Sequence, residues 1–322
     1  MSKSKKLSPE AYMEKLQKKI ADDLKEKNFA TAEEANKYVQ ENYLNREIEF
    51  DDSNLSPAEQ AQDLIYEAGD CDDTEEAIKL AEKALKLDEN CADAYNLLAE
   101  LKAEDVDEAL EFYVKGIEAG KKTLGKNFEE YKGHFWGFHE TRPFMRAMAG
   151  YANALWGKGE KSKSIEVIKE MLMLNPDDNQ GMRQDLITRL LILNRILEAE
   201  KLYNDYKDDP SAVWRYSKAY LYFIKRSKNI YADAALKEAM EYNPYVPFYI
   251  FGLRDMPDEM PEYAGFGDEN EAIYYVEQAL ELWAKNDKAA KWFANLFQKM
   301  EGMLNLLIEE RERERDKREK HS

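Results

Sequence analysis

The chain has 322 residues, a formal net charge of −18 and a mean hydropathy of −0.74. Hydrophobic residues make up 44% of it, which is too apolar for a disordered chain, and the low content of 14 Gly favours helices over sheet. The acidic balance argues against nucleic acid as a partner, because phosphate contacts need clustered Lys and Arg. No apolar run of roughly 18 residues occurs, so the sequence predicts no membrane-spanning helix.

Cysteine usage and the start of the chain predict a cytoplasmic location. Cys71 and Cys91 lack the CxxC spacing of metal and redox motifs, and two lone cysteines suit a reducing compartment. The basic start MSKSKKL is not followed by an apolar segment, so it does not fit a secretory signal.

Residues 1–56 are predicted to form an N-terminal helical segment that ends in an acidic linker. Pro9 after Ser8 suits the first turn of one helix. Thr31 and Glu34 have the spacing of a capping box for a second helix.

Residues 57–286 carry a repeated helical pattern. Pro176, Pro210 and Pro244 stand 34 residues apart, and each closes an apolar-periodic run. A period of about 34 residues is typical of tetratricopeptide repeats, in which stacked helix pairs bury faces that one pair cannot bury alone. We therefore predict an all-α fold, an α-solenoid of tetratricopeptide-like helix pairs.

Small and apolar residues one helical turn apart mark the second helix of each predicted pair, where two helices approach closely. The sets are Ala77, Ala81 and Ala84; Ala109, Tyr113 and Gly116; Ser164, Ile168 and Met171; Ala199 and Tyr203; Ala232, Leu236 and Ala239; and Ala272, Val276 and Ala279. Their uneven spacing predicts five or six pairs with insertions at 119–141 and 253–270. The second insertion contains two prolines and two glycines, so we expect a loop there.

Residues 287–322 are predicted to form a C-terminal capping helix with a charged tail. Its apolar residues, Trp292 and Phe293 among them, suit the cover that the open end of a solenoid needs. They could instead mediate self-assembly, although we favour a monomer. Every residue from Glu309 to Lys320 is charged, which predicts a solvated helix end.

Several stretches resemble known families. The segments GHFWGFHETRPFMRAMAGYANALWGKGE and MLMLNPDDNQGMR are similar to bacterial tetratricopeptide-repeat proteins of uncharacterised function. The segments ALKEAMEYNPYVPFYI and GDENEAIYYVEQALELW resemble the helical region of the suppressor-of-tumorigenicity-7 family. The resemblance covers roughly residues 55–295 and implies an all-helical repeat fold with no established enzymatic activity. This chain differs from the animal members in lacking a predicted membrane-spanning segment.

The motifs that could carry chemistry are incomplete. His139 and Glu140 begin like the zinc-protease motif HExxH, but Pro143 stands where the second His is required. His134 and His139 could share a metal with Glu140, but a third ligand at a recognisable spacing is missing. We predict no catalytic residue, no metal site and no cofactor.

A ligand groove is predicted from side chains on the first helix of a pair, because those helices line the concave face of tetratricopeptide solenoids. Arg142, Arg146 and Asn153 fall on or near one face of a helix that starts at Pro143. Arginine suits bidentate recognition of a carboxylate, and asparagine can bond a peptide backbone. Gln180 and Arg183 are predicted to join them.

We therefore predict a non-enzymatic scaffold that binds a protein or peptide on its concave face. One alternative is an enzyme or small-molecule sensor with a polar site around His134–Arg146. Another is that Glu140 and Arg142 only tie the first insertion to the helix that follows it.

Overall fold

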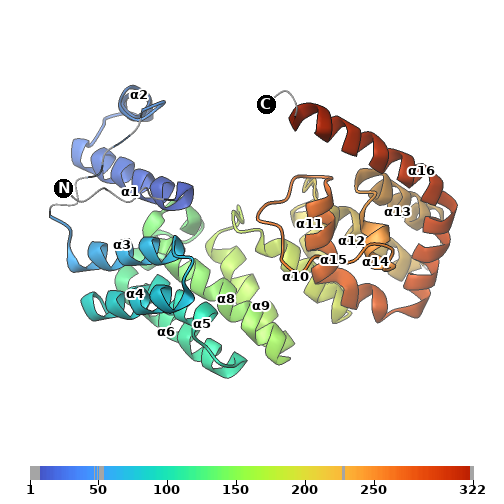
Figure 1. Ribbon diagram of the computed structural model, residues 1–322, viewed down its shortest axis with the longest axis horizontal. Helices are drawn as coiled ribbons and strands as arrows, with labels where there is room; N and C mark the ends of the chain where they lie inside the picture. The colour runs from blue at the N-terminus through green and yellow to red at the C-terminus, as the bar shows by residue number, and fades with distance from the viewer. Residues whose placement is uncertain (1–7, 47, 49, 51–53, 227–228, 320–322) are drawn as a thin grey trace. The chain divides into compact units, whose positions relative to one another are not determined.

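A computed structural model describes residues 8–46, 48, 50, 54–226 and 229–319. These residues form α-helices and short 3₁₀ turns joined by loops, with no β-strand among them (Figure 1), as the all-α prediction requires. None of the helices in this part of the chain is long and apolar enough to cross a membrane. The chain divides into two compact units, residues 1–180 and 181–322, which are described separately.

The first unit contains nine α-helices and two 3₁₀ turns within its described residues. They are α1 (Pro9–Lys27), α2 (Ala32–Asn42), α3 (Pro57–Gly69), α4 (Thr74–Leu87), α5 (Ala92–Leu101), α6 (Val106–Leu124), α7 (Asn127–Glu130), η1 (Phe135–Gly137), η2 (His139–Thr141), α8 (Arg142–Lys158) and α9 (Lys161–Leu174). Successive helices pack in pairs, α3 with α4, α5 with α6 and α8 with α9. The first helices of these pairs also contact one another, α3 with α5 and α5 with α8, so they form a row.

The second unit continues the pairing. It contains α10 (Met182–Ile192), α11 (Ile196–Asp205), α12 (Ala212–Arg226), α13 (Ile230–Tyr242), α14 (Val246–Ile250), α15 (Glu269–Ala284) and α16 (Asp287–Glu319). Pairs form between α10 and α11, α12 and α13, and α15 and α16.

Side-chain caps and prolines set the helix ends much as the sequence predicts. Ser8 caps α1, and the Thr31 hydroxyl accepts a hydrogen bond from the Glu34 amide at the start of α2. The three spaced prolines follow the ends of α9, α11 and α13, where the absence of an amide hydrogen costs no helical bond.

The predicted small residues let second helices pack closely. Most members of these sets are buried, including all of those on α4, α9, α13 and α15. On α6, a Cβ added to Gly120 would lie 2.7 Å from the Cβ of Phe144, so only glycine permits this approach of α6 to α8. The helix continues through Ala119 to Leu124, and the first insertion therefore begins later than predicted.

Aromatic packing builds the core of the first insertion. Phe135 and Phe144 are fully buried, and both contact Phe128 edge to face. Phe138 stacks on Tyr131 with ring centroids 3.9 Å apart. These contacts fix the turn that leads into α8, and with it the position of the α8 N-terminus.

The second insertion is a loop, as predicted, and it is followed by α15 and then α16. The loop is anchored by α15, where Tyr274 donates to the Pro261 carbonyl and Asn270 to the Tyr263 carbonyl.

The prediction of a solvated end to α16 is wrong at Arg311, which donates to the carbonyls of Gly267, Glu241 and Tyr242. A guanidinium here satisfies carbonyls that the end of α13 leaves open.

Candidate functional site

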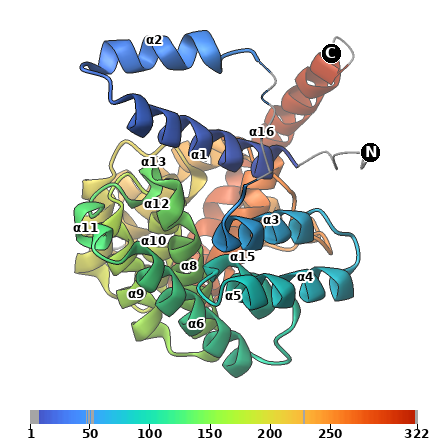
Figure 2. The same ribbon diagram turned by 90° about the vertical axis from the view of Figure 1, so that its left-hand side faces the viewer.

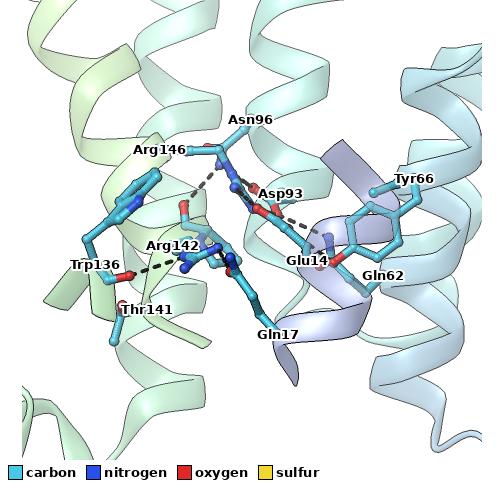
Figure 3. A network of polar contacts seen from close by, with 12 residues as sticks. Glu14, Gln17, Gln62, Tyr66, Asp93, Asn96, Trp136, Thr141, Arg142 and Arg146 are labelled. Atoms are coloured by element: carbon cyan, nitrogen blue, oxygen red, sulfur yellow. Dashed lines mark hydrogen bonds and ion pairs between the residues drawn. The ribbon is translucent and has the colours of Figure 1, made fainter. Parts of the chain in front are cut away.

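A network of paired charges in the first unit lies between α1 and the row of first helices. Side chains from α3 and α8 converge there on Glu14 and Gln17 of α1, and Asp93 of α5 pairs with Arg146 beside them (Figure 3). We call the residues of the row that contact α1 the docking face: Glu59, Asp63, Tyr66, Arg142 and Arg146. In Figure 2, α1 lies above α3 and α8, with α2 on its far side.

Arg146 is the centre of the docking face. Its Nε and Nη2 donate to the two carboxylate oxygens of Asp93, at 2.9 and 2.5 Å, and its Nη1 donates to Glu14 Oε1 at 2.7 Å. Burial alone would lower the pKa of the guanidinium, but the Asp93 and Glu14 carboxylates outweigh it and raise the pKa. Arg146 therefore links α8 both to α5 and to α1.

Asp93 of α5 is the buried acid that pairs with Arg146. Only 5% of the residue is exposed, and its carboxylate also accepts from Gln62 Nε2 at 3.2 Å and Asn96 Nδ2 at 3.0 Å. Burial by itself would raise the pKa of Asp93, but Arg146 and these two amides lower it. Because Asn96 donates to the Pro143 carbonyl as well, at 3.0 Å, the network joins α3, α5 and α8 without help from α1.

Arg142 lies one turn before Arg146. Its Nη1 donates to Gln17 Oε1 at 2.5 Å, and its Nε donates to the Trp136 carbonyl at 3.2 Å. Burial lowers the pKa of this guanidinium. Arg142 thus does bond the first insertion, and it also bonds α1.

The predicted polar cluster of the insertion is split. His139 Nδ1 lies 3.1 Å from Glu140, whose carboxylate also accepts from the Tyr131 hydroxyl at 2.8 Å. Burial lowers the pKa of His139. His134 is exposed, and the described residues contain no group of three or more His, Cys, Asp or Glu side chains able to hold a metal. The arrangement offers ion pairing and hydrogen bonding.

The remaining predicted groove residues lie farther along the chain. Asn153 is exposed on α8, eleven residues after Arg142, a spacing that places the two on the same helix face. Gln180 ends the first unit, whereas Arg183 belongs to the second, where its Nε donates to Asp209 Oδ2 at 2.7 Å. Their common groove with Arg142 stays a prediction.

Sequence reasoning missed the occupant of this face and the acid beneath it. Glu14 and Gln17 sit on a charged helix that looks solvated in sequence, and Glu14 is 132 residues away from Arg146. Asp93 looks like an ordinary first-turn acid, which favours a helix N-terminus through the macrodipole. Its one distinguishing signal is its position in a mostly apolar run, ADAYNLLAE.

The fold and site define an all-helical protein of packed helix pairs with a charged face covered by a helix of its own chain. Similar proteins include a human suppressor of tumorigenicity 7 protein-like, 25% identical over 258 residues, which cover 71% of this chain and 41% of the relative. The chicken protein of the same name is 23% identical over 235 residues, which cover 66% of this chain and 42% of the relative. The chain thus spans about two fifths of these relatives' length. A scan against protein-family models finds no match.

Proposed function

We propose that the protein is a non-enzymatic scaffold built as a solenoid of tetratricopeptide-like helix pairs. Residues 57–286 form the repeats in this proposal, preceded by the segment 1–56 and closed by 287–322. The packing of consecutive helices in pairs and the burial of small residues on second helices support it. The distant similarity to suppressor of tumorigenicity 7 protein-like sequences is compatible with such a role.

The scaffold binds a protein or peptide on the face formed by α3, α5 and α8. One observation supports this most directly: a helix, α1, is already held there by side chains from two of these helices, with Asp93 of α5 pairing the central arginine. The pairing network among α3, α5 and α8 orders Arg146 before any partner arrives, which lowers the entropic cost of binding.

We call the whole surface of α3, α5 and α8 the binding face; it includes the docking face and extends beyond the part that α1 covers. Glu100 lies seven residues after Asp93 on α5, and Asn153 lies seven residues after Arg146 on α8, so each continues the face of the earlier residue by two turns. Both are exposed. A partner can therefore contact this stretch even while α1 is docked.

Site-specific photo-cross-linking in the native cell tests the proposal. A photoreactive amino acid at Glu100 or Asn153 probes the proposed binding face, and the same amino acid at exposed Glu170 or Met173 of α9 is the matched control. We expect a discrete cross-linked protein from the first two positions only. Equal cross-linking from α9, or cross-linking from α9 alone, contradicts the proposed face.

A further inference from the structure

The contacts of α1 define what kind of ligand fits the docking face. On the α8 side the face offers hydrogen-bond donors, Arg142 and Arg146, which meet Gln17 and Glu14. On the α3 side it offers carboxylates, and these accept from lysines of α1. The lysine pairs are Lys15 with Asp63 at 2.8 Å and Lys18 with Glu59 at 2.5 Å.

This division of charge sets the direction and rotation of a bound helix. Glu14, Gln17 and Lys18 stand at positions i, i+3 and i+4, which share one face of a helix, and Lys15 flanks them on the α3 side. A helix turned end for end would bring its lysines toward the arginines. The face therefore selects a helix with an acceptor pair toward α8 and a lysine pair toward α3.

The contacts between α1 and the docking face are hydrogen bonds and ion pairs. Among its described side chains only Ala11 is buried, and the groups that pair with the row are partly exposed. Ion pairs in such settings contribute little net free energy and weaken with salt. By contrast, α16 buries a series of large apolar side chains, including Trp292, Phe293 and Leu304.

The contacts of α1 would also allow it to leave while the row of α3, α5 and α8 stays folded. Its C-terminal half bonds α2, since the hydroxyls of Tyr38 and Tyr43 both donate to Asp23 Oδ2, at 2.9 and 2.5 Å. The row keeps its own links through Asp93, Asn96 and Gln62. Departure of α1 would expose three donors aimed at its former position: Arg142 Nη1, Arg146 Nη1 and the Tyr66 hydroxyl.

Resting on the proposed function, we propose that α1 is an exchangeable occupant of the docking face and that the partner is a helix with the same pattern of charged and amide side chains. That helix carries a carboxylate at position i, an amide or second acceptor at i+3, and lysines at i+1 and i+4. It displaces α1, so the docking face stays covered by α1 until such a helix is present at sufficient concentration. A tethered occupant competes at high effective concentration, which restricts binding to matching helices.

A peptide of residues 8–28 carrying a fluorophore tests exchange on the full-length chain. We expect weak binding to the wild type, binding roughly tenfold tighter to Glu14→Ala, whose own α1 is loosened, and loss of that gain when the peptide itself carries Glu14→Ala. Glu26→Ala removes the same charge from an exposed position of α1 and serves as the matched control. Binding to Glu14→Ala should weaken as salt rises from 0.1 to 0.5 M, by roughly tenfold or more.

Hydrogen exchange of α1 in the same variants shows whether α1 has been released from the docking face. Exchange in α1 should rise in Glu14→Ala and stay at the wild-type level in Glu26→Ala. An unchanged α1 in Glu14→Ala, or a released α1 without peptide binding, overturns the exchange mechanism. Peptide exchange without any cross-linked protein at Glu100 or Asn153 would instead sink the proposed function and leave α1 exchange standing.

Discussion

Replacement of Arg146 by alanine should destabilise the first unit through Asp93. The substitution removes the two charge-assisted hydrogen bonds that Asp93 receives and leaves this residue, which is 5% exposed, with only the amides of Gln62 and Asn96 as donors. Breaking a buried pair from one side costs about 3–5 kcal/mol. Because two neutral donors remain, we expect the lower end, about 3 kcal/mol.

Hydrogen exchange of the core amides of α5 measures this cost within the first unit. A loss of about 3 kcal/mol corresponds to exchange roughly a hundredfold faster in the slowest amides. Arg46→Ala, at an exposed position, controls for loss of a positive charge and should exchange like the wild type. Asp93→Asn/Arg146→Met removes both charges and should recover most of the loss.

Two results would refute this reasoning. If Arg146→Ala exchanges at nearly the wild-type rate, Asp93 is not an uncompensated buried charge. If the double variant is as labile as Arg146→Ala, the loss comes from packing of the long side chain and the carboxylate is not its cause.

Three further predictions follow from the same contacts. The pKa of Asp93 is lowered in the folded state, so its ionisation stabilises the fold above about pH 4, the usual carboxyl range. The free energy of unfolding, measured at several pH values, should therefore fall on acidification in the wild type, and less so in Asp93→Asn. Gly150→Ala should destabilise the protein by about 1–3 kcal/mol in thermal unfolding, because the new Cβ would lie 2.1 Å from the Tyr113 ring. Gly157→Ala on the same helix meets nothing within 4 Å and should be neutral or stabilising, so equal effects of the two substitutions would contradict this. Arg311→Ala should cost about 1–2 kcal/mol and increase hydrogen exchange at the end of α13, and exposed Arg315→Ala should change neither.

The helices were largely predictable because their determinants are local. Ser8 and Thr31 cap their helices through side chains a few residues from the amides they bond. Pro176 and Pro244 follow helix ends within two residues, since proline cannot continue the hydrogen-bond ladder. Most of the predicted alanines on second helices are buried, because helical periodicity decides which face packs.

The docking face was only half predictable. Helical spacing placed Arg142 and Arg146 on one face, and both do contact partners there. Their partners on α1 could not be found, because a charged helix has the same composition whether it is solvated or docked on an opposite charge pattern. The contacts of Arg311 were missed because its partners are backbone carbonyls, which carry no sequence signal.

The measurement that tests the central claim most directly is hydrogen exchange of the full chain with and without the partner captured at Asn153. The account predicts that the partner protects amides of α5 and α8 while α1 exchanges faster, because the incoming helix takes the contacts of Glu14 and Gln17. Unchanged protection of α1, with new protection confined to α4, α6 and α9, would contradict it.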